Sequence, residues 1–147
     1  MVTGTVSPAE VLAKSKTIAV VGASKNPEKE AHTVPRYLKD HGYRIIPVNP
    51  TATEIMGERA YPSLLDLPAD VAQTVDVVEV FRPSEELARV ALQTVEMKKR
   101  TGRAVFFWAQ EGLESEEAKR TLEKNGVQYV MDACMRVVHQ IYVRKTA

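Results

Sequence analysis

The sequence predicts an α/β protein, namely a single Rossmann-like, doubly wound parallel sheet of five strands with helices on both faces. Short β-branched, apolar segments recur along the chain and alternate with amphipathic helical segments. This alternation is typical of a parallel sheet that helices cover on both faces. No repeat, low-complexity run or Pro/Gly-rich linker interrupts it. We therefore expect one domain over residues 1–147.

In the first third of the chain, prolines and glycines mark the ends of the elements. Pro8 suits the first position of a helix, and Gly22 ends an apolar, β-branched run. Pro35 is tolerated in the first turn of a second helix, which Gly42 stops. Pro47 is the unfavourable residue in the strand that follows. The expected elements are a helix at 7–15, a strand at 17–21, a helix at 33–41 and a strand at 44–48.

The remaining elements follow from caps, charges and apolar runs. Ser84 is placed to cap a long helix, whose last turn carries Lys98, Lys99 and Arg100 as the helix dipole favours. Residues 51–75 give a weaker pattern, with either a small strand pair or a loop at 55–61. The other expected elements are a helical turn at 64–67, strands at 75–80, 104–108 and 127–131, helices at 84–100 and 115–124, and a short helix across His139.

Composition excludes several classes of protein. The 20 Lys and Arg residues nearly balance the 19 Asp and Glu residues, which argues against binding nucleic acid or an anionic membrane. No apolar stretch approaches the ~20 residues that span a bilayer, and the N-terminus lacks an export signal. One cysteine and three histidines make a metal cage improbable. We expect a cytoplasmic protein.

The turns that follow the first four strands are the candidate site, because ligands of open parallel sheets bind beyond the carboxyl ends of the strands. The first turn suits a phosphate. Gly22 permits close approach of the backbone, Ser24 offers a hydroxyl and an amide, and Lys25 and Arg82 add positive charge. The alternative is that Gly22 simply ends a strand and Lys25 is a solvated surface residue.

The form of the first turn argues against two nucleotide classes. A dinucleotide fingerprint has three glycines and an acidic residue after the second strand, whereas this chain has Gly22 alone and Asn49-Pro50 at that point. A phosphate-loop NTPase needs a Gly-Lys-Ser/Thr triplet, and the sequence contains none. These observations favour a phosphate-bearing nucleotide as the ligand, for which NAD is a poor fit.

Four motifs, TIAVVGAS (17–24), IPVNP (46–50), VDVVEVFRP (75–83) and WAQEG (108–112), resemble the small bacterial and archaeal CoA-binding proteins. The fold of that family is similar to the N-terminal domain of the succinyl-CoA synthetase alpha subunit. The resemblance extends from about Ser15 to His139, with the motifs in the same order.

The resemblance implies coenzyme A, or an acyl-CoA, as the ligand, and it assigns each turn a part of the site. The first turn would meet the phosphates, the second would border the nucleotide, the third would form the opposite wall, and the fourth would close the site near the pantetheine arm. The implied residues are Gly22, Ala23, Ser24 and Lys25; Val48, Asn49 and Pro50; Phe81, Arg82 and Pro83; and Trp108, Ala109, Gln110 and Glu111.

The chain departs from the synthetase pattern in two ways. Thr51-Ala52-Thr53 stands where the synthetase has a phosphate-binding lysine. The phosphorylated histidine of the synthetase lies in a second domain, which this chain does not contain. We therefore expect a non-catalytic carrier, sensor or regulatory module, with an unidentified protein partner or a second copy left open. The alternative is an enzyme, either a partner subunit in acyl-CoA chemistry or an NAD(P)-dependent oxidoreductase.

Two further side chains have open roles. Cys134 follows the fifth strand and is either a small buried apolar residue or a thiol that faces the pocket, where a mixed disulfide with CoA is conceivable. His32 lies between the glycine turn and the next helix, and it is either a surface histidine or a phosphate contact.

Overall fold

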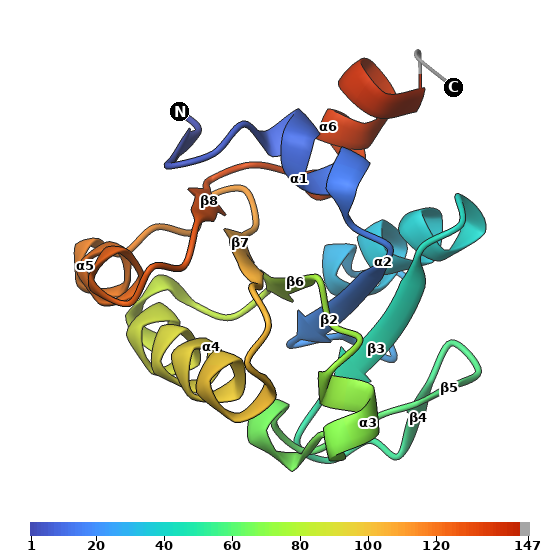
Figure 1. Ribbon diagram of the computed structural model, residues 1–147. Helices are drawn as coiled ribbons and strands as arrows, with labels where there is room; N and C mark the ends of the chain where they lie inside the picture. Colours follow the sequence, from blue (N-terminus) through green and yellow to red (C-terminus); the bar gives the residue numbers. More distant parts are fainter. Residues whose placement is uncertain (145–147) are drawn as a thin grey trace.

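The computed structural model describes residues 1–144 and confirms a mostly parallel sheet with helices on both faces (Figure 1). The sheet has six strands instead of five, in the order β1-β8-β7-β6-β2-β3. Because β2 lies between β3 and β6, the winding of the chain reverses between β2 and β6, and a ligand crevice is expected there. The parallel strands are β2 (Thr17–Val21), β3 (Arg44–Val48), β6 (Val77–Val80), β7 (Phe106–Ala109) and β8 (Tyr129–Met131).

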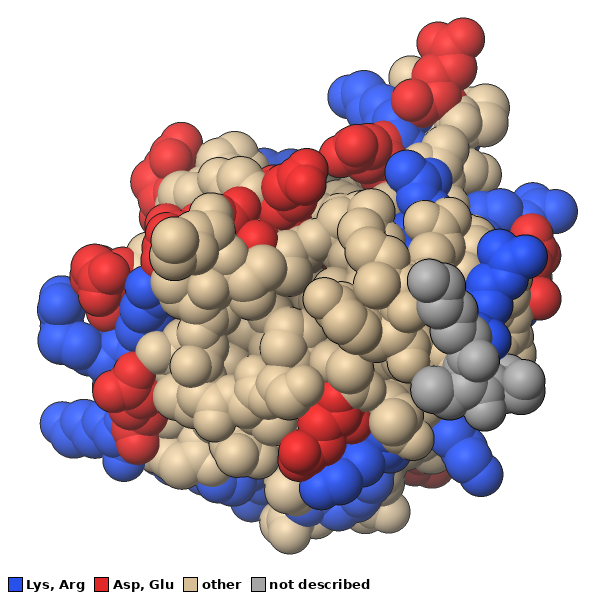
Figure 2. Space-filling model, turned by 90° about the horizontal axis from the view of Figure 1, so that it is seen from above, with Lys and Arg blue, Asp and Glu red and all other residues tan. Residues whose placement is uncertain are grey.

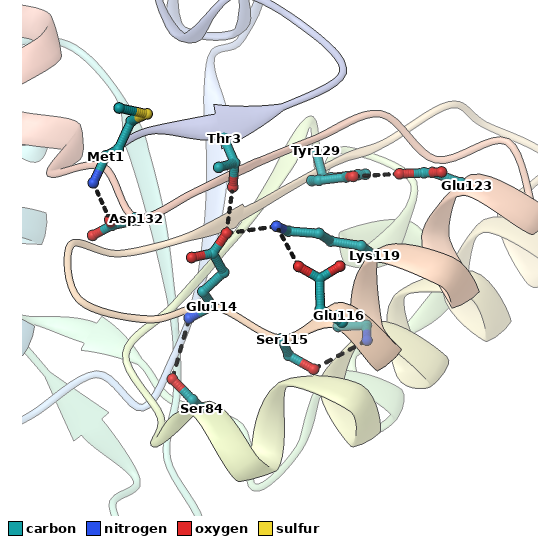
Figure 3. Close-up of polar contacts among 11 residues, drawn as sticks. Met1, Thr3, Ser84, Glu114, Ser115, Glu116, Lys119, Glu123, Tyr129 and Asp132 are labelled. Atoms are coloured by element: carbon teal, nitrogen blue, oxygen red, sulfur yellow. Dashed lines mark hydrogen bonds and ion pairs between the residues drawn. The ribbon is translucent and has the colours of Figure 1, made fainter.

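The strand that the sequence did not predict is β1 (Thr3–Gly4), which pairs antiparallel with β8. Two residues are too few to show an alternating apolar pattern, so no signal marked it. Figure 3 shows how side chains attach this strand to helix α5 (Glu116–Lys124). The hydroxyl of Thr3 donates to Glu114 at 3.0 Å, and Lys119 forms an ion pair with the same carboxylate.

The helices form two layers because successive strand residues point to opposite faces. Ile18 and Val20 belong to one apolar cluster, whereas Ala19 and Val21 belong to the other. The first cluster packs against α1 (Pro8–Lys14), α2 (Glu30–Asp40) and α6 (Met135–Val138) with its π-helical continuation His139–Val143. The second packs against α4 (Leu87–Thr101), α5 and the 3-10 turn Leu64–Asp66.

Two helix starts differ from the prediction. Helix α2 begins at Glu30, three residues before the expected start at residue 33. Ser84 does not cap a helix with its side chain; it opens a 3-10 turn, Ser84–Glu86, that leads into α4. Its hydroxyl instead accepts a hydrogen bond from the backbone N–H of Glu114, which links the third and fourth turns (Figure 3).

Of the two alternatives for residues 55–61, the structure has the strand pair, β4 (Glu54–Ile55) and β5 (Glu58–Arg59). The segment between β3 and β6 also contains one helix that was not predicted, α3 (Ala69–Ala72). After β5 the chain returns to β3, where the N–H of Tyr61 donates to the carbonyl of Pro47. Pro47 is tolerated because β3 is the outermost strand of the main sheet.

Exposed apolar side chains gather around α1 and the C-terminal helical segment. Figure 2 shows this face of the molecule, where charged residues lie mostly toward the margins. Among residues 1–144, no helix is long and apolar enough to cross a membrane. The large exposed apolar residues near this face are Met1, Val2, Val137, Ile141 and Tyr142.

Candidate functional site at the carboxyl edge of the sheet

Gly22 is the point at which the first and third turns touch. It has a φ of 89°, a conformation that strongly favours glycine. A Cβ atom at this position would lie 2.9 Å from the carbonyl oxygen of Phe81 and 2.9 Å from Cδ of Arg82. The N–H of Gly22 also donates to Val48 O, and the N–H of Phe81 donates to Val21 O. The turns after β2, β3 and β6 are therefore fixed against one another at the predicted switch point.

The side chain of Asn49 joins the second turn to the first. Its Nδ2 donates to the carbonyl of Ala23 at 2.9 Å, and its Oδ1 accepts from the backbone N–H groups of Thr51 and Ala52. The amide of asparagine can be donor and acceptor at once, which the carboxylate of an aspartate cannot. An acidic residue, as in the dinucleotide fingerprint, would place a carboxylate against the Ala23 carbonyl, so this geometry explains the asparagine.

In the loop after Ala23, Ser24 presents its hydroxyl but not its amide. The N–H of Ser24 donates to Ala31 O, so the expectation that Ser24 offers a free amide was wrong. Its Oγ accepts from the N–H of Asn26 at 3.0 Å, which leaves the hydroxyl proton available to a ligand. His32 stabilises the loop because its Nδ1–H donates to Ser24 O at 2.7 Å, which leaves Nε2 as the nitrogen open to a ligand.

The positive charges of Arg82 and Arg89 at the candidate site are partly neutralised within the protein. Arg82 forms two hydrogen bonds with Glu86, and Arg89 binds the same carboxylate at 2.7 Å. The hydrogen bond from Arg82 is the main cause that holds the pKa of Glu86 below its ordinary value, with a smaller contribution from Arg89. Lys25 is exposed, and its side chain has no partner among residues 1–144. A ligand phosphate would therefore compete with Glu86 for Arg82 but not for Lys25.

A cavity of about 120 Å³ lies beside Gly22, between the first two turns and α4. It is smaller than the roughly 300–1,000 Å³ of most ligand pockets, so it can take only one part of a large ligand. Apolar side chains line it together with two arginines and Glu86, a mixture that can accept a part of a ligand with both apolar and anionic groups. Its lining includes Val48, Pro50, Leu64, Arg82 and Arg89.

The fourth turn is packed against the fifth instead of lying open. Trp108 and Ala109 are fully buried, and Nε1 of Trp108 donates to Ala133 O at 2.8 Å. Gln110 is 2% exposed; its Oε1 accepts from the N–H of Met135, and its Nε2 has no hydrogen-bond partner in the described chain. Of the four predicted residues in this turn, only Glu111 is exposed.

Glu79 lies on a strand of the site and was not predicted from the sequence as a site residue. It is fully buried on β6, and neither carboxyl oxygen has a hydrogen-bond partner among residues 1–144. Burial raises the pKa of Glu79 to about 8, so the carboxyl is mostly neutral near pH 7. The signal was present in the sequence, because Glu79 is the one charged residue in the apolar run VVEV.

Cys134 lies at the start of α6 and is partly buried against the same apolar cluster as Trp108. It is a free thiol next to Ala133, whose carbonyl binds Trp108. Within residues 1–144, no group of three or more His, Cys, Asp or Glu side chains could hold a metal ion.

The parallel sheet, together with the crevice position at the carboxyl ends of β2 and β6, defines a Rossmann-like α/β protein. Within that class, the chain belongs to the family described as CoA binding domain, whose model matches residues 16–140.

Three known proteins illustrate how the chain relates to others. It is 42% identical to the uncharacterized protein YneT of Bacillus subtilis (strain 168) over 132 residues, which cover 90% of this chain and 91% of YneT. It is 32% identical to the alpha subunit of acetate–CoA ligase (ADP-forming) II of Pyrococcus furiosus and covers only 25% of that subunit. The solved structure of cell-free ID.343 from Thermus thermophilus has a TM-score of 0.79 and 38% identity, and the match covers 92% of this chain and 98% of that one.

Replacing Gly22 with alanine should destabilise the protein by about 3 kcal/mol or more, because the new Cβ meets the Phe81 backbone in addition to straining a positive φ. Gly42→Ala is the matched control, since Gly42 has a φ of 95° but a Cβ added there would meet nothing within 4 Å; it should lose only about 1 kcal/mol. Urea unfolding measures the free energy of unfolding of both variants. An equal decrease in the two would mean that the contact with Phe81 does not contribute.

Asn49→Asp should destabilise the protein by about 1–3 kcal/mol, because the donor to the Ala23 carbonyl becomes an acceptor. Asn26→Asp is the control, because the side chain of Asn26 only accepts a hydrogen bond, from the N–H of Glu28. Thermal unfolding near pH 7 compares the two variants. A similar loss in both would contradict the role given to Asn49.

The raised pKa of Glu79 predicts a pH-dependent stability. Between about pH 4.5 and pH 8 the unfolded chain loses this proton while the folded chain keeps it. The free energy of unfolding should therefore decrease as pH rises through this window, by on the order of 5 kcal/mol in total. In Glu79→Gln, the free energy of unfolding should no longer show this decrease when it is measured by denaturant titration at several pH values. The same pH dependence in the variant and the native protein would show that Glu79 is ionised in the folded protein.

Proposed function

We propose that this protein binds CoA or an acyl-CoA at the carboxyl edge of its parallel sheet, as a non-catalytic carrier, sensor or regulatory module. The single observation that carries the proposal is the contact of Gly22 with Phe81 and Arg82. That contact brings a backbone turn suited to phosphate next to a cationic side chain and a partly apolar cavity. Membership of the CoA binding domain family supports CoA as the ligand.

In this proposal the predicted residues divide into those that touch the ligand and those that position them. The contacts at the phosphates are the Ala23 backbone, the Ser24 hydroxyl, and the side chains of Lys25 and Arg82, whereas Gly22 permits close approach while its N–H stays bonded to Val48 O. Val48 and Pro50 border the base, with Phe81 and Pro83 opposite. The hydrogen bonds and burial described above favour positioning roles for Asn49, Trp108, Ala109 and Gln110, with Glu111 nearest to the pantetheine arm.

A second candidate is a partner subunit in acyl-CoA chemistry. The relation to the alpha subunit of an ADP-forming acetate–CoA ligase favours it, since this chain spans a quarter of that subunit. In that case the reacting groups would come from another polypeptide, and the present chain would supply the nucleotide end of the site. An NAD(P)-dependent oxidoreductase is less favoured, because Asn49 is used as a donor to Ala23 where such enzymes carry an acid.

Calorimetric titration with CoA tests the assigned site. Arg82→Ala should weaken binding by about 10-fold or more, since a charge-assisted hydrogen bond is lost, and Ser24→Ala by a few-fold. Glu86→Gln should strengthen binding, because Arg82 and Arg89 no longer share a carboxylate.

Arg100→Ala is the matched control for these variants. Arg100 forms the same type of pair, with Glu96 at four residues' separation, in the last turns of α4 and so at the end of that helix away from Arg82 and Glu86. Its removal should leave the affinity unchanged. Unchanged affinity in Arg82→Ala and Ser24→Ala would remove the assigned site. A thermal-shift comparison of CoA, NAD, NADP and ATP tests the ligand itself, because the ligand that binds the folded state raises the Tm.

A further inference from the structure

Three buried side-chain atoms near the proposed site lack hydrogen-bond partners in the described chain. They are the two carboxyl oxygens of Glu79 and the Nε2 of Gln110. An unpaired buried polar atom costs about 1–3 kcal/mol, so it is unusual to find a donor and two acceptors left over in one part of a small protein. Among residues 1–144, the only other such atom is Oγ of Ser15.

The sheet register places these two residues together. Glu79 pairs with Trp108, and Val80 pairs with Ala109, so Gln110 lies one step beyond on the neighbouring strand. Val77 and Trp108 belong to the same apolar cluster, whereas Val80 and Ala109 belong to the other. By alternation, Glu79 and Gln110 therefore lie on the same face of the sheet, as diagonal neighbours.

The chemistry of the two groups is complementary. A neutral carboxylic acid has one donor and acceptor capacity, and the amide of Gln110 has a free N–H₂. A buried water molecule needs two to four polar partners, and proteins hold about one such water per 27 residues. Long side chains on diagonal positions can share one water, which satisfies the acceptors of Glu79 and the donor of Gln110 together.

We propose that the Glu79 carboxylic acid and the Gln110 amide form one buried hydrogen-bonded unit, bridged by an internal water molecule, that positions the fourth turn and makes ligand binding sensitive to the charge on Glu79. The unit extends to α6, because Oε1 of Gln110 accepts from the N–H of Met135. Its effect on binding rests on the proposed CoA function; its existence does not.

Ionisation of Glu79 would disturb this unit for a simple reason. A carboxylate cannot donate, and a fully buried negative charge on β6 would have to attract water or a cation. Burial alone accounts for the shifted pKa of Glu79, with no contribution from a charged neighbour. The other titratable and charged groups that surround this face are Glu10 and Lys14 of α1, His32, Tyr37 and His41 of α2, Tyr43, Cys134, Arg136, His139 and Arg144.

Infrared spectroscopy of the ligand-free protein tests whether the unit exists. The carbonyl band of a protonated carboxylic acid should be visible near pH 6.5, where exposed carboxylates are ionised, and it should be absent in Glu79→Gln. In Gln110→Met, which keeps the volume, the band should shift because its hydrogen-bonding environment changes. Gln128→Met, at an exposed glutamine, is the control and should leave the band in place. A missing band, or one unmoved in Gln110→Met, would overturn the proposal.

Acetyl-CoA titrations across pH test the link to binding, with the thioester chosen because it has no free thiol to ionise. Between about pH 7 and pH 9 the affinity of the native protein should fall about tenfold, whereas Glu79→Gln should show less than a twofold change. Cys134→Ala should keep the native profile, which excludes the nearby thiol as the cause.

Equal pH profiles in the native protein and in Glu79→Gln would refute the coupling to the site, and this comparison does not depend on whether Gln110→Met folds. If acetyl-CoA binds none of these proteins at any pH, the proposed CoA function fails, and the infrared bands alone then decide whether the buried unit exists.

Discussion

The close approach of Gly22 to the backbone of Phe81 is the constraint on which the candidate site depends. A parallel sheet brings the carboxyl ends of its strands to one edge, but it does not by itself fix the turns that follow them. Here the missing side chain lets two turns meet at van der Waals distance, and the N–H of Gly22 adds the end of β3 through Val48. The amide of Asn49 then holds the second turn on the first. These contacts hold the edge in one arrangement, and such preorganisation would reduce the entropy lost in the binding proposed above.

The carboxyl edge of the sheet has two parts that differ in exposure and in charge. The turns after β2, β3 and β6 are partly exposed and carry Lys25 and Arg82. The turns after β7 and β8 are packed on each other through Trp108 and Gln110 and expose little beyond Glu111. Glu79 lies on β6, the strand shared by the two parts. The charged side chains that can attract an anion therefore lie in the first part. The turns of the second part are held together mainly by packing and hydrogen bonds.

Apolar patterning was sufficient to predict the five parallel strands, the helices between them and the edge at which the motifs meet. It could not predict β1, because a two-residue strand has no period, or α3, because a single helical turn has little pattern of its own. Patterning also assigns a residue to a face without saying how deeply it is buried. The family resemblance implied that Trp108 lies beside the ligand, whereas its side chain lies in the core. The engagement of the Ser24 amide by Ala31 depends on the loop path, which no sequence signal encodes.

Short segments of the same chain cover part of each margin of the main sheet. On one side β1 pairs with β8, and on the other the segment that returns after β5 hydrogen-bonds to β3 through Tyr61. Open margins invite strand addition by other polypeptides, which leads to domain swapping and fibrillar aggregation. At the positions that these segments occupy, the backbone donors and acceptors of the margins are used internally, so strand addition there would first have to displace the segments.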